Sequence, residues 1–426
     1  MPHLPTLLTY GLGADSTAVL LDFLARPTFH GLRPDLSDLI VATAMTGDEW
    51  DDTIADVERH ILPRLRRAGV RYVQLARGGP RDADGILVLD DSRAPTRLYP
   101  AGPWRLSDEL TAAGTVPMVA NGHRTCSLKF KGWPLDKWAG QEFGARPYRR
   151  AIGYNADERG RAEKDRRLTA QARTACTPIY PLIEMGWGRA RVEQILHERL
   201  GVILNKSYCA QCPFSGVAAS RERHEARLRR FPEHAVQVLA MEYTAMALNE
   251  NSSLYATASL YGRLAEDPAN AVILDKFDAH LDAVDWAVYD VRRIYNAKRT
   301  PGCRAEHGPT CRTPAPGCRD EHAKGPAWRA VTTLYTGPRD TAELLVRKVA
   351  HKHQAPLRRG ETSSIARAHY LEHIADTYPA AHGCIVAAPA GAKDKQRPGF
   401  ARRWRQITGG VGLPYRPREA AHNASS

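Results

Sequence analysis

The chain has 426 residues, of which 25% are charged and 43% apolar, and its formal net charge is +13. This length predicts two or three domains that fold without disulfides, and the composition excludes disordered and collagen-like chains. No stretch approaches the roughly 18 apolar residues of a membrane span, and the first residues do not resemble a signal peptide. We therefore expect a cytoplasmic protein without a membrane partner. The positive charge favours a polyanionic partner such as nucleic acid.

The first half of the chain alternates short apolar runs with amphipathic stretches. Buried strands are predicted at residues 6–10, 39–45, 71–75 and 148–153, and helices at residues 16–24 and 51–68. Strands separated by helices predict an α/β fold, a doubly wound parallel sheet with helices on both faces. Residues 78–117 are rich in Gly, Pro and Asp, so we expect them to form an excursion outside the sheet.

The pattern changes after about residue 216. Apolar residues spaced three and four apart predict helices at residues 221–239, 265–280, 283–297, 340–353 and 363–378, whereas residues 328–335 are β-like. The second half is therefore expected to be mainly helical. The predicted division is a first domain at 1–216, a helical region at 217–298, a Cys/His-rich insertion at 299–326 and an α/β region with a basic tail at 327–426.

A glycine-rich turn follows the first predicted strand. Gly11 and Gly13 let the backbone approach an anion closely, and Ser16 and Thr17 fall at the start of the next helix. Free N–H groups and the helix dipole favour phosphate at that position. The turn is neither the Gly-x-Gly-x-x-Gly dinucleotide fingerprint nor a Walker loop, because Gly-Lys-Ser/Thr is absent. On these residues alone, a phosphate site and a purely structural turn both remain open.

The turn also resembles a known motif. Gly11-Leu-Gly-Ala-Asp-Ser16 is similar to the Ser-Gly-Gly-x-Asp-Ser pyrophosphate loop of the ATP pyrophosphatase (PP-loop) superfamily, with Gly11 in place of Ser and Leu12 in place of Gly. Later segments resemble phosphoadenosine-phosphosulfate (PAPS) reductases in the same order: residues 46–53, 124–129 with Pro134-Leu135, 153–159, 180–187 and Cys209-Ala-Gln-Cys212. The resemblance covers residues 5–216.

This resemblance implies the adenine nucleotide alpha hydrolase-like fold, with ATP and Mg²⁺ as ligands. Asp48 and Glu49, after the second strand, offer carboxylates to Mg²⁺, with solvated loop carboxylates as the alternative. The implied nucleotide-binding residues are Gly11, Gly13, Asp15, Ser16, Thr17, Thr46, Asp48 and Arg159. The implied catalytic or substrate-contacting residues are Asp15, Lys129, Asp157 and Glu158.

Four cysteines lie in the first half. Cys209-x-x-Cys212 has the spacing of a metal-binding or redox pair. The resembling iron–sulfur sulfonucleotide reductases hold their cluster with a Cys-Cys pair and a distant Cys-x-x-Cys, and here the pair is reduced to Cys126-Ser127. The resemblance thus implies a 4Fe–4S cluster on Cys126, Cys209 and Cys212, with Cys176 as the fourth ligand or one iron open to a sulfide. Zinc and free thiols are the alternatives.

Three further cysteines crowd together in the second half. Cys303, Cys311, Cys318 and His322 give the ligand set of a closed structural Zn²⁺ site, and their spacing resembles Cys-Cys-Cys-His zinc fingers that bind RNA. His307 is a rival ligand, because Pro-Gly-Cys-Arg-x-Glu-His occurs twice. The alternative is a loop with unligated thiols.

The reductases also carry a C-terminal Glu-Cys-Gly segment with their nucleophilic thiol, and none is present here. Cys384 is better explained as a buried cysteine in a strand. We therefore expect ATP-dependent adenylation of a substrate, with release of pyrophosphate, for sulfur insertion. Charge and resemblance to the ATP pyrophosphatase of DNA phosphorothioation favour a nucleic acid substrate, with a cysteine desulfurase as sulfur donor and a homodimer as the assembly. A sulfonucleotide reductase and a non-catalytic nucleotide- and nucleic-acid-binding module are the alternatives.

Overall fold

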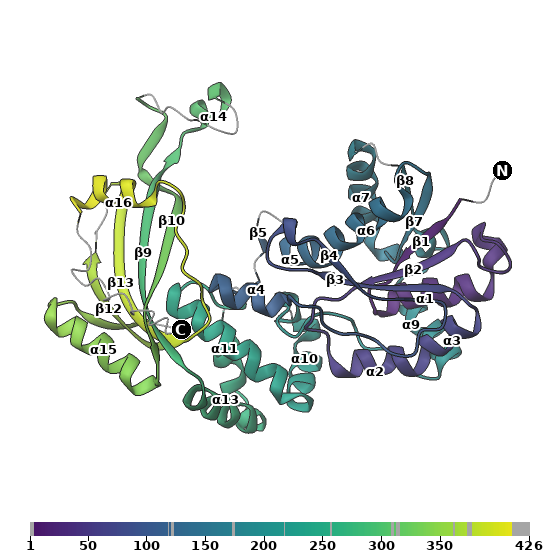
Figure 1. The fold of residues 1–426 in the computed structure, drawn as a ribbon, viewed down its shortest axis with the longest axis horizontal. Helices are drawn as coiled ribbons and strands as arrows, with labels where there is room; N and C mark the ends of the chain where they lie inside the picture. The colour runs from purple at the N-terminus through teal and green to yellow at the C-terminus, as the bar shows by residue number, and fades with distance from the viewer. Residues whose placement is uncertain are drawn as a thin grey trace, which may run out of the picture. The chain divides into compact units, whose positions relative to one another are not determined.

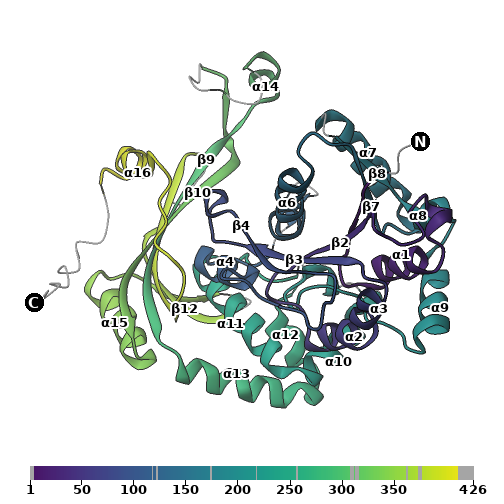
Figure 2. The same ribbon diagram turned by 45° about the vertical axis from the view of Figure 1, so that its right-hand side comes forward.

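The computed structural model describes residues 4–117, 119–120, 123–172, 175–216, 218–255, 258–307, 311, 316–360, 363–372 and 377–410. The chain divides into two compact units. The first comprises Met1–Glu109 and Pro117–Phe214, and the second comprises Leu110–Val116 and Ser215–Ser426. Each unit contains its own sheet with packed helices (Figures 1 and 2).

The first unit is built on a six-stranded sheet with the strand order β4-β3-β2-β1-β7-β8. All neighbouring strands are parallel except the edge strand β4, which is antiparallel to β3. Because parallel strands point the same way, the loops that follow β1, β2 and β7 leave the sheet at one edge. The strands are β1 (Thr6–Thr9), β2 (Leu39–Ala44), β3 (Arg71–Arg77), β4 (Ile86–Ser92), β7 (Tyr148–Ile152) and β8 (Cys176–Ile179).

Helices cover both faces of this sheet, which confirms the predicted α/β fold (Figure 1). Alternate side chains of β1 face opposite ways: Leu8 packs with α1 and α9, and Leu7 packs with Trp138 and Phe143 of α6. The helices are α1 (Ala14–Ala25), α2 (Asp51–His60), α3 (Leu62–Arg67), α5 (Thr125–Ser127), α6 (Trp133–Phe143), α7 (Arg159–Ala172), α8 (Pro181–Glu184) and α9 (Arg189–Leu200). Helix α4 (Leu106–Ala113) begins in the first unit, and its residues from Leu110 onward belong to the second. A short hairpin, β5 (Val119–Ala120) and β6 (His123–Arg124), precedes α5.

Two details of the first unit differ from the sequence-based expectation. Ile86–Ser92 forms β4, so the expectation that residues 78–117 lie outside the sheet is wrong for this segment. Its short apolar run ends in two aspartates and forms a partly exposed edge strand, with Val88 44% exposed. The helix predicted at residues 51–68 is two helices, because Pro63 in the first turn of α3 lacks the N–H that a continuous helix needs.

The second unit contains a five-stranded antiparallel sheet with the order β10-β9-β13-β12-β11. Strands β9 and β10 form a long ribbon with α14 between them in the chain, and Figure 2 shows the ribbon extending beyond the other strands to α14. The strands are β9 (Trp286–Arg299), β10 (Arg319–Gly337), β11 (Leu357–Gly360), β12 (Ser363–Glu372) and β13 (Ala380–Pro389).

Helices pack on this second sheet and complete its core. Helices α11 and α15 pack against β13, and Met246 of α11 joins Tyr289 and Val386 in one apolar cluster. Phe400 and Trp404 of α16 pack with Ile294 of β9 in another. The helices are α10 (Ala218–Arg230), α11 (Pro232–Leu248), α12 (Leu260–Ala265), α13 (Ala271–Ala283), α14 (Pro301–His307), α15 (Arg339–Lys352) and α16 (Phe400–Thr408).

Two helices predicted in the second half are wrong. Residues 283–297 contain most of β9, and residues 363–378 contain β12. The first segment is rich in Trp, Val, Tyr and Ile, and these residue types suit a buried strand, so packing in the sheet overrides the helical spacing. The helix predicted at residues 340–353 is confirmed as α15. Within the described ranges, no helix is both long and apolar enough to cross a membrane.

Candidate nucleotide and metal sites

The glycine-rich turn joins β1 to α1 at the carboxyl edge of the first sheet. Gly13 precedes α1, and among the described residues no side chain caps that helix end, which leaves first-turn N–H groups for another acceptor. Leu12 adopts φ 61°, a left-handed conformation that costs a non-glycine residue about 1–2 kcal/mol. The resembling motif has Gly at this position. Here the Leu12 side chain is buried in the core, and its burial offsets the cost.

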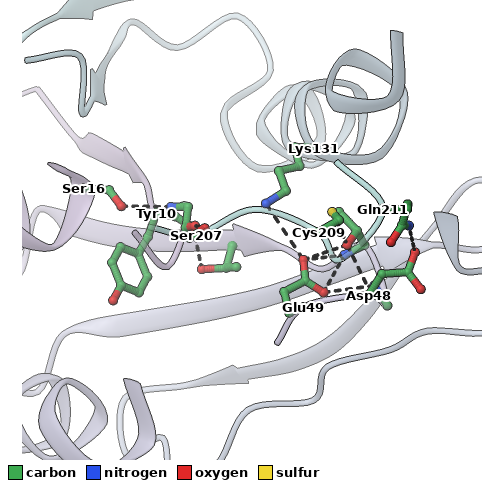
Figure 3. A network of polar contacts seen from close by, with 12 residues as sticks. Tyr10, Ser16, Asp48, Glu49, Lys131, Ser207, Cys209 and Gln211 are labelled. Atoms are coloured by element: carbon green, nitrogen blue, oxygen red, sulfur yellow. Dashed lines mark hydrogen bonds and ion pairs between the residues drawn. The ribbon is translucent and has the colours of Figure 1, made fainter. Parts of the chain in front are cut away.

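Ser16 holds the turn closed. Its Oγ accepts a hydrogen bond from Gly11 N at 3.2 Å and donates to Gly13 O at 3.1 Å. From the segment that leads to Cys-x-x-Cys, Ser207 Oγ donates to Gly11 O at 2.5 Å (Figure 3). Gly153 passes directly behind the turn, where a Cβ would lie 2.8 Å from Ser16 N. The turn is therefore fixed from both sides by chain segments distant in sequence.

Thr17 does not reach the open side of the turn. Its side chain is fully buried, and its hydroxyl lies 3.0 Å from the Tyr10 hydroxyl. Thr43 Oγ1 donates to Tyr10 O at 2.9 Å and accepts from the Tyr72 hydroxyl at 2.9 Å. These hydroxyls form a buried network under the turn. The expectation that Thr17 binds a nucleotide at the helix start is not supported by this geometry, because its N–H donates to Gly13 O at 3.0 Å and its hydroxyl contacts Tyr10 in the core.

Asp15 and Asp157 belong to one polar network. The Asp15 carboxyl accepts hydrogen bonds from Asn155 Nδ2 at 3.1 Å and Arg189 Nη1 at 3.3 Å. Burial raises the pKa of Asp15, whereas Asn155 and Arg189 lower it. Asp157 accepts from Arg189 N at 2.8 Å, and its own N–H donates to Asn155 Oδ1 at 3.0 Å. The network joins α1 to the loop after β7 and to the start of α9.

The two residues after Asp157 lie at the start of α7. Glu158 pairs with Arg161 on that helix, and Arg159 is exposed. Arg161 also lies over the Tyr154 ring, with 4.5 Å from its guanidinium carbon to the ring centroid. The structure therefore places Glu158 and Arg159 at the rim of the Asp15 network.

A second polar cluster follows β2. Thr46 donates its hydroxyl to Glu49 Oε1 at 2.8 Å, and its N–H donates to the same oxygen at 3.1 Å. Lys131 Nζ lies 3.9 Å from Glu49 Oε1 (Figure 3). Lys129, the lysine expected from the motif, instead donates to Glu109 Oε1 at 2.5 Å. Lys131 is therefore the lysine of this segment that reaches the cluster.

Asp48 is engaged by protein donors. Its Oδ2 accepts hydrogen bonds from Gln211 Nε2 at 2.6 Å and Ser107 N at 2.8 Å. Burial raises the pKa of Asp48 to about 6, against the lowering effect of these hydrogen bonds, and the charge of Glu49 adds to the increase. Asp48 thus ties the loop after β2 to the Cys-x-x-Cys segment, and this oxygen is already occupied by donors that a Mg²⁺ ion would have to displace.

Three of the four cysteines predicted to bind a cluster line one cavity of about 230 Å³ in the first unit. Gly11 of the glycine-rich turn and Lys131 line the same cavity. The Thr46 hydroxyl lies 3.3 Å from Cys209 Sγ (Figure 3). Burial raises the pKa of the Cys209 thiol. The cysteines of this cavity, called the pocket cysteines below, are Cys126, Cys209 and Cys212.

Cys176 is not brought to this cavity. It begins β8 and pairs with Tyr148, the first residue of β7, at the amino edge of the parallel strands. The glycine-rich turn follows Thr9 at the opposite edge. The expectation that Cys176 supplies a fourth ligand is therefore corrected: a residue at the start of a parallel strand lies a full strand length from the loops at its end.

Three cysteines of the second half come together near the end of the ribbon. Their sulfur atoms lie within 4.8 Å of one another, a separation that one metal ion can bridge. His322 lies on β10 and is not part of this group, so the structure does not support it as the fourth ligand. The His307 side chain lies outside the described residues. The cysteines of this group, called the tip cysteines below, are Cys303, Cys311 and Cys318.

A basic side chain and the backbone support the tip. Arg299 Nε and Nη2 lie 3.4 and 3.3 Å from Cys303 Sγ, a position that favours the thiolate a metal requires. Thr300 N donates to Cys318 O at 3.2 Å, and its hydroxyl donates to Gly317 O at 2.9 Å. These contacts therefore hold three thiols that could bind a metal ion beside the end of β9.

No protein-family model, curated protein or solved structure matches this chain. The interpretation of both sites therefore depends on the residues and their geometry.

Sequence reasoning missed several residues of the first site. Ser207 and Arg189 bind the turn or Asp15, but each is separated from its partner by at least 174 positions. Asn155 binds Asp15 and lies inside the resembling segment 153–159, so its place in that motif was a signal. Lys131 and Gln211 lie within two residues of predicted positions, and their proximity to the motifs is the one signal that could have found them.

Proposed function

We propose that this chain is an ATP-dependent enzyme of the PP-loop type, which adenylates a nucleic acid with release of pyrophosphate so that sulfur can be inserted. One observation carries the proposal. The glycine-rich turn and the pocket cysteines, which are far apart in sequence, line the same cavity at the carboxyl edge of the sheet. In open parallel sheets this edge is where ligands bind.

The turn is suited to a pyrophosphate group. The uncapped start of α1 offers N–H donors and the positive end of a helix dipole to the phosphates. In the proposed reaction, an oxygen of the substrate attacks the α-phosphorus of ATP, and pyrophosphate leaves. A sulfur nucleophile then displaces AMP from the adenylated substrate. The residues assigned to phosphate and Mg²⁺ are Gly11, Gly13, Asp15 and Ser16, because the carboxylates of Asp48 and Glu49 already accept hydrogen bonds from protein donors.

The pocket cysteines fit an iron–sulfur cluster better than a single ion. Two sulfur atoms bound to one Zn²⁺ are at most about 4.6 Å apart. Among the described residues, the sulfur atoms of the three pocket cysteines do not all lie within 4.8 Å of one another. A cluster binds each thiolate on a different iron and so tolerates wider spacing. Cys126, Cys209 and Cys212 would hold it, and with three ligands one iron would be open to sulfide. Lys131 would place a positive charge beside the thiolates.

The charge distribution supports a nucleic acid as the substrate. Helix α7 begins beside the Asp15 network and buries only Ala162, while most of its other side chains are exposed. Aromatic rings lie under two of its arginines: Tyr154 under Arg161 and Tyr180 under Arg166. Cations interleaved with aromatic rings suit phosphates and bases. The exposed basic residues of α7 are Arg159, Arg161, Lys164, Arg166 and Arg167.

Reduction of a sulfonucleotide is disfavoured by the placement of Cys384. This thiol is buried in β13 among apolar residues, and burial raises its pKa to about 12. A neutral thiol in that position does not attack a sulfonucleotide.

Pyrophosphate release from ATP tests the proposal. Protein purified without oxygen is incubated with ATP and Mg²⁺, alone and with DNA, RNA or a sulfonucleotide, and pyrophosphate, AMP and sulfite are measured. We expect pyrophosphate only with ATP and a nucleic acid. Sulfite released from the sulfonucleotide with thioredoxin would favour a reductase. Absence of any nucleotide binding would contradict the proposal and favour a binding module.

A further inference from the structure

Two histidines and a glutamate converge on the neighbouring strands β12 and β13 of the second unit. His369 Nδ1 lies 2.8 Å from His382 Nε2 and 3.4 Å from Glu372 Oε1. One ligand atom from each of the three residues lies within 4.8 Å of the others. His369 is buried, His382 is half-buried and Glu372 is exposed, so the group is held by the sheet on one side and is open to water on the other.

A β-bulge explains this convergence. In a regular strand, residues three apart point to opposite faces. The register between β12 and β13 shifts after His369, and Tyr370 is the extra residue. The Tyr370 ring lies over Gly383, where a Cβ would come within 2.5 Å of the ring. The shift turns His369 and Glu372 to the same face, and Glu372 is the direct cross-strand partner of His382.

The three side chains have the chemistry of a transition-metal site. Two imidazole nitrogens and a carboxylate oxygen are ligands of Zn²⁺ and related divalent ions. With bonds of about 2.0–2.1 Å, tetrahedral geometry separates two ligand nitrogens by about 3.3 Å, so small ring rotations convert the contact between His369 and His382 into a metal site. Arg358 Nη1 donates to Glu372 Oε1 at 2.8 Å, and a donor behind a ligand orients it for the metal.

We propose that His369, His382 and Glu372 form a separate metal site, which binds one Zn²⁺ or a similar first-row divalent ion and leaves the remaining coordination position to water. The ion joins β12 to β13 at the bulge, where the strand pairing is interrupted. The site involves neither the tip cysteines nor the glycine-rich turn, so a test of this site and a test of the proposed function are independent of each other.

Zinc counting on the full-length protein tests this site. Chelator-treated protein is equilibrated with buffered free Zn²⁺, and bound Zn²⁺ per chain is measured by atomic emission. The variants are His382→Ala and Glu372→Gln, with His351→Ala on the surface of α15 as the matched control. Because Glu372 is exposed, Glu372→Gln keeps the test valid if His382→Ala does not fold.

We expect each ligand variant to bind the Zn²⁺ of this site more weakly than the wild type does. Loss of a residue behind a ligand weakens metal binding roughly 10–100-fold, and loss of a ligand itself should weaken it more. The control variant should match the wild type. This site has no sulfur ligand, so Co²⁺ bound here should lack the thiolate charge-transfer absorption that is expected of Co²⁺ bound to the tip cysteines. Equal stoichiometry and affinity for Zn²⁺ in wild type, His382→Ala and Glu372→Gln would overturn the proposal.

Discussion

One group of cysteines was inferred from spacing and the other from a family resemblance, and the two groups differ in how the fold assembles them. The tip cysteines lie in the connection from β9 to β10, within 16 residues of one another, and their sulfur atoms are close enough for one ion. The pocket cysteines come from α5 and from the segment after α9, and they line a cavity together with the glycine-rich turn. The three sulfur atoms of the tip cysteines are therefore close enough to hold one ion, whereas the pocket cysteines line a cavity of about 230 Å³.

The largest expected effect is the loss of Zn²⁺ from the tip cysteines, which would distinguish them from the pocket cysteines. Cys318→Ser removes one of the three thiolates and should abolish zinc binding at the tip cysteines. Because structural Zn²⁺ contributes roughly 10–16 kcal/mol of apparent binding energy in zinc-finger peptides, the local loss of stability should be large. Hydrogen exchange should rise around α14, while pyrophosphate release stays near wild type. Cys176→Ser, which belongs to neither group, is the matched control. Unchanged zinc content in Cys318→Ser would contradict the assignment of the tip.

The pH dependence of the free energy of unfolding tests how the buried Asp48 carboxyl affects stability beside the pocket cysteines. The pKa of Asp48 is raised from 3.8 to about 6, so its contribution to stability is fully present below about pH 4 and is lost as the pH rises through 6. At about 1.36 kcal/mol per pH unit, the loss is on the order of 3 kcal/mol. Asp48→Asn should flatten the dependence of the free energy of unfolding on pH between about 4 and 6, measured by urea denaturation. The same slope in both proteins would refute this explanation.

The Asp15 network should matter for turnover more than for folding. Asp15→Asn keeps the shape of the side chain but removes its charge beside Arg189 and Asn155. We expect pyrophosphate release to fall about 100-fold, a loss typical of a group that positions or stabilises the reacting phosphates. Asp35→Asn, on an exposed loop, should retain wild-type activity. Equal activity in both variants would favour the non-catalytic interpretation.

The smallest expected effect tests the support behind the turn. Gly153→Ala places a Cβ 2.8 Å from Ser16 N and must displace the turn, which we expect to cost about 1–3 kcal/mol and to weaken ATP binding. Gly140→Ala, in α6, meets nothing within 4 Å and should be neutral or slightly stabilising. Thermal unfolding and equilibrium dialysis with ATP measure both effects. Similar ATP affinity in the two variants would show that the turn does not bind the nucleotide.

The sequence was most informative where the information is local. The first strands, the turn and α15 follow from apolar periodicity and glycine placement. It was misleading for β9 and β12, where helices were predicted. The secondary structure of a segment that fits both the helical and the strand pattern is determined by the sheet in which it packs. Cys176 shows the same limit for the site: it lies between the pocket cysteines in the sequence, but its place at the start of a parallel strand removes it from the cavity. Neither the Ser207 contact nor the bulge at Tyr370 has a local signature.

Cysteine alkylation with and without ATP tests most directly whether the glycine-rich turn and the pocket cysteines form one site. Metal-free, reduced protein is pulsed with iodoacetamide, and mass spectrometry follows every cysteine in one sample. The account predicts that ATP with Mg²⁺ slows alkylation of Cys126 and Cys212, which line the cavity with Gly11, and leaves the rates at Cys176 and the tip cysteines unchanged. If ATP protects none of the pocket cysteines, or protects all cysteines alike, the shared site is contradicted.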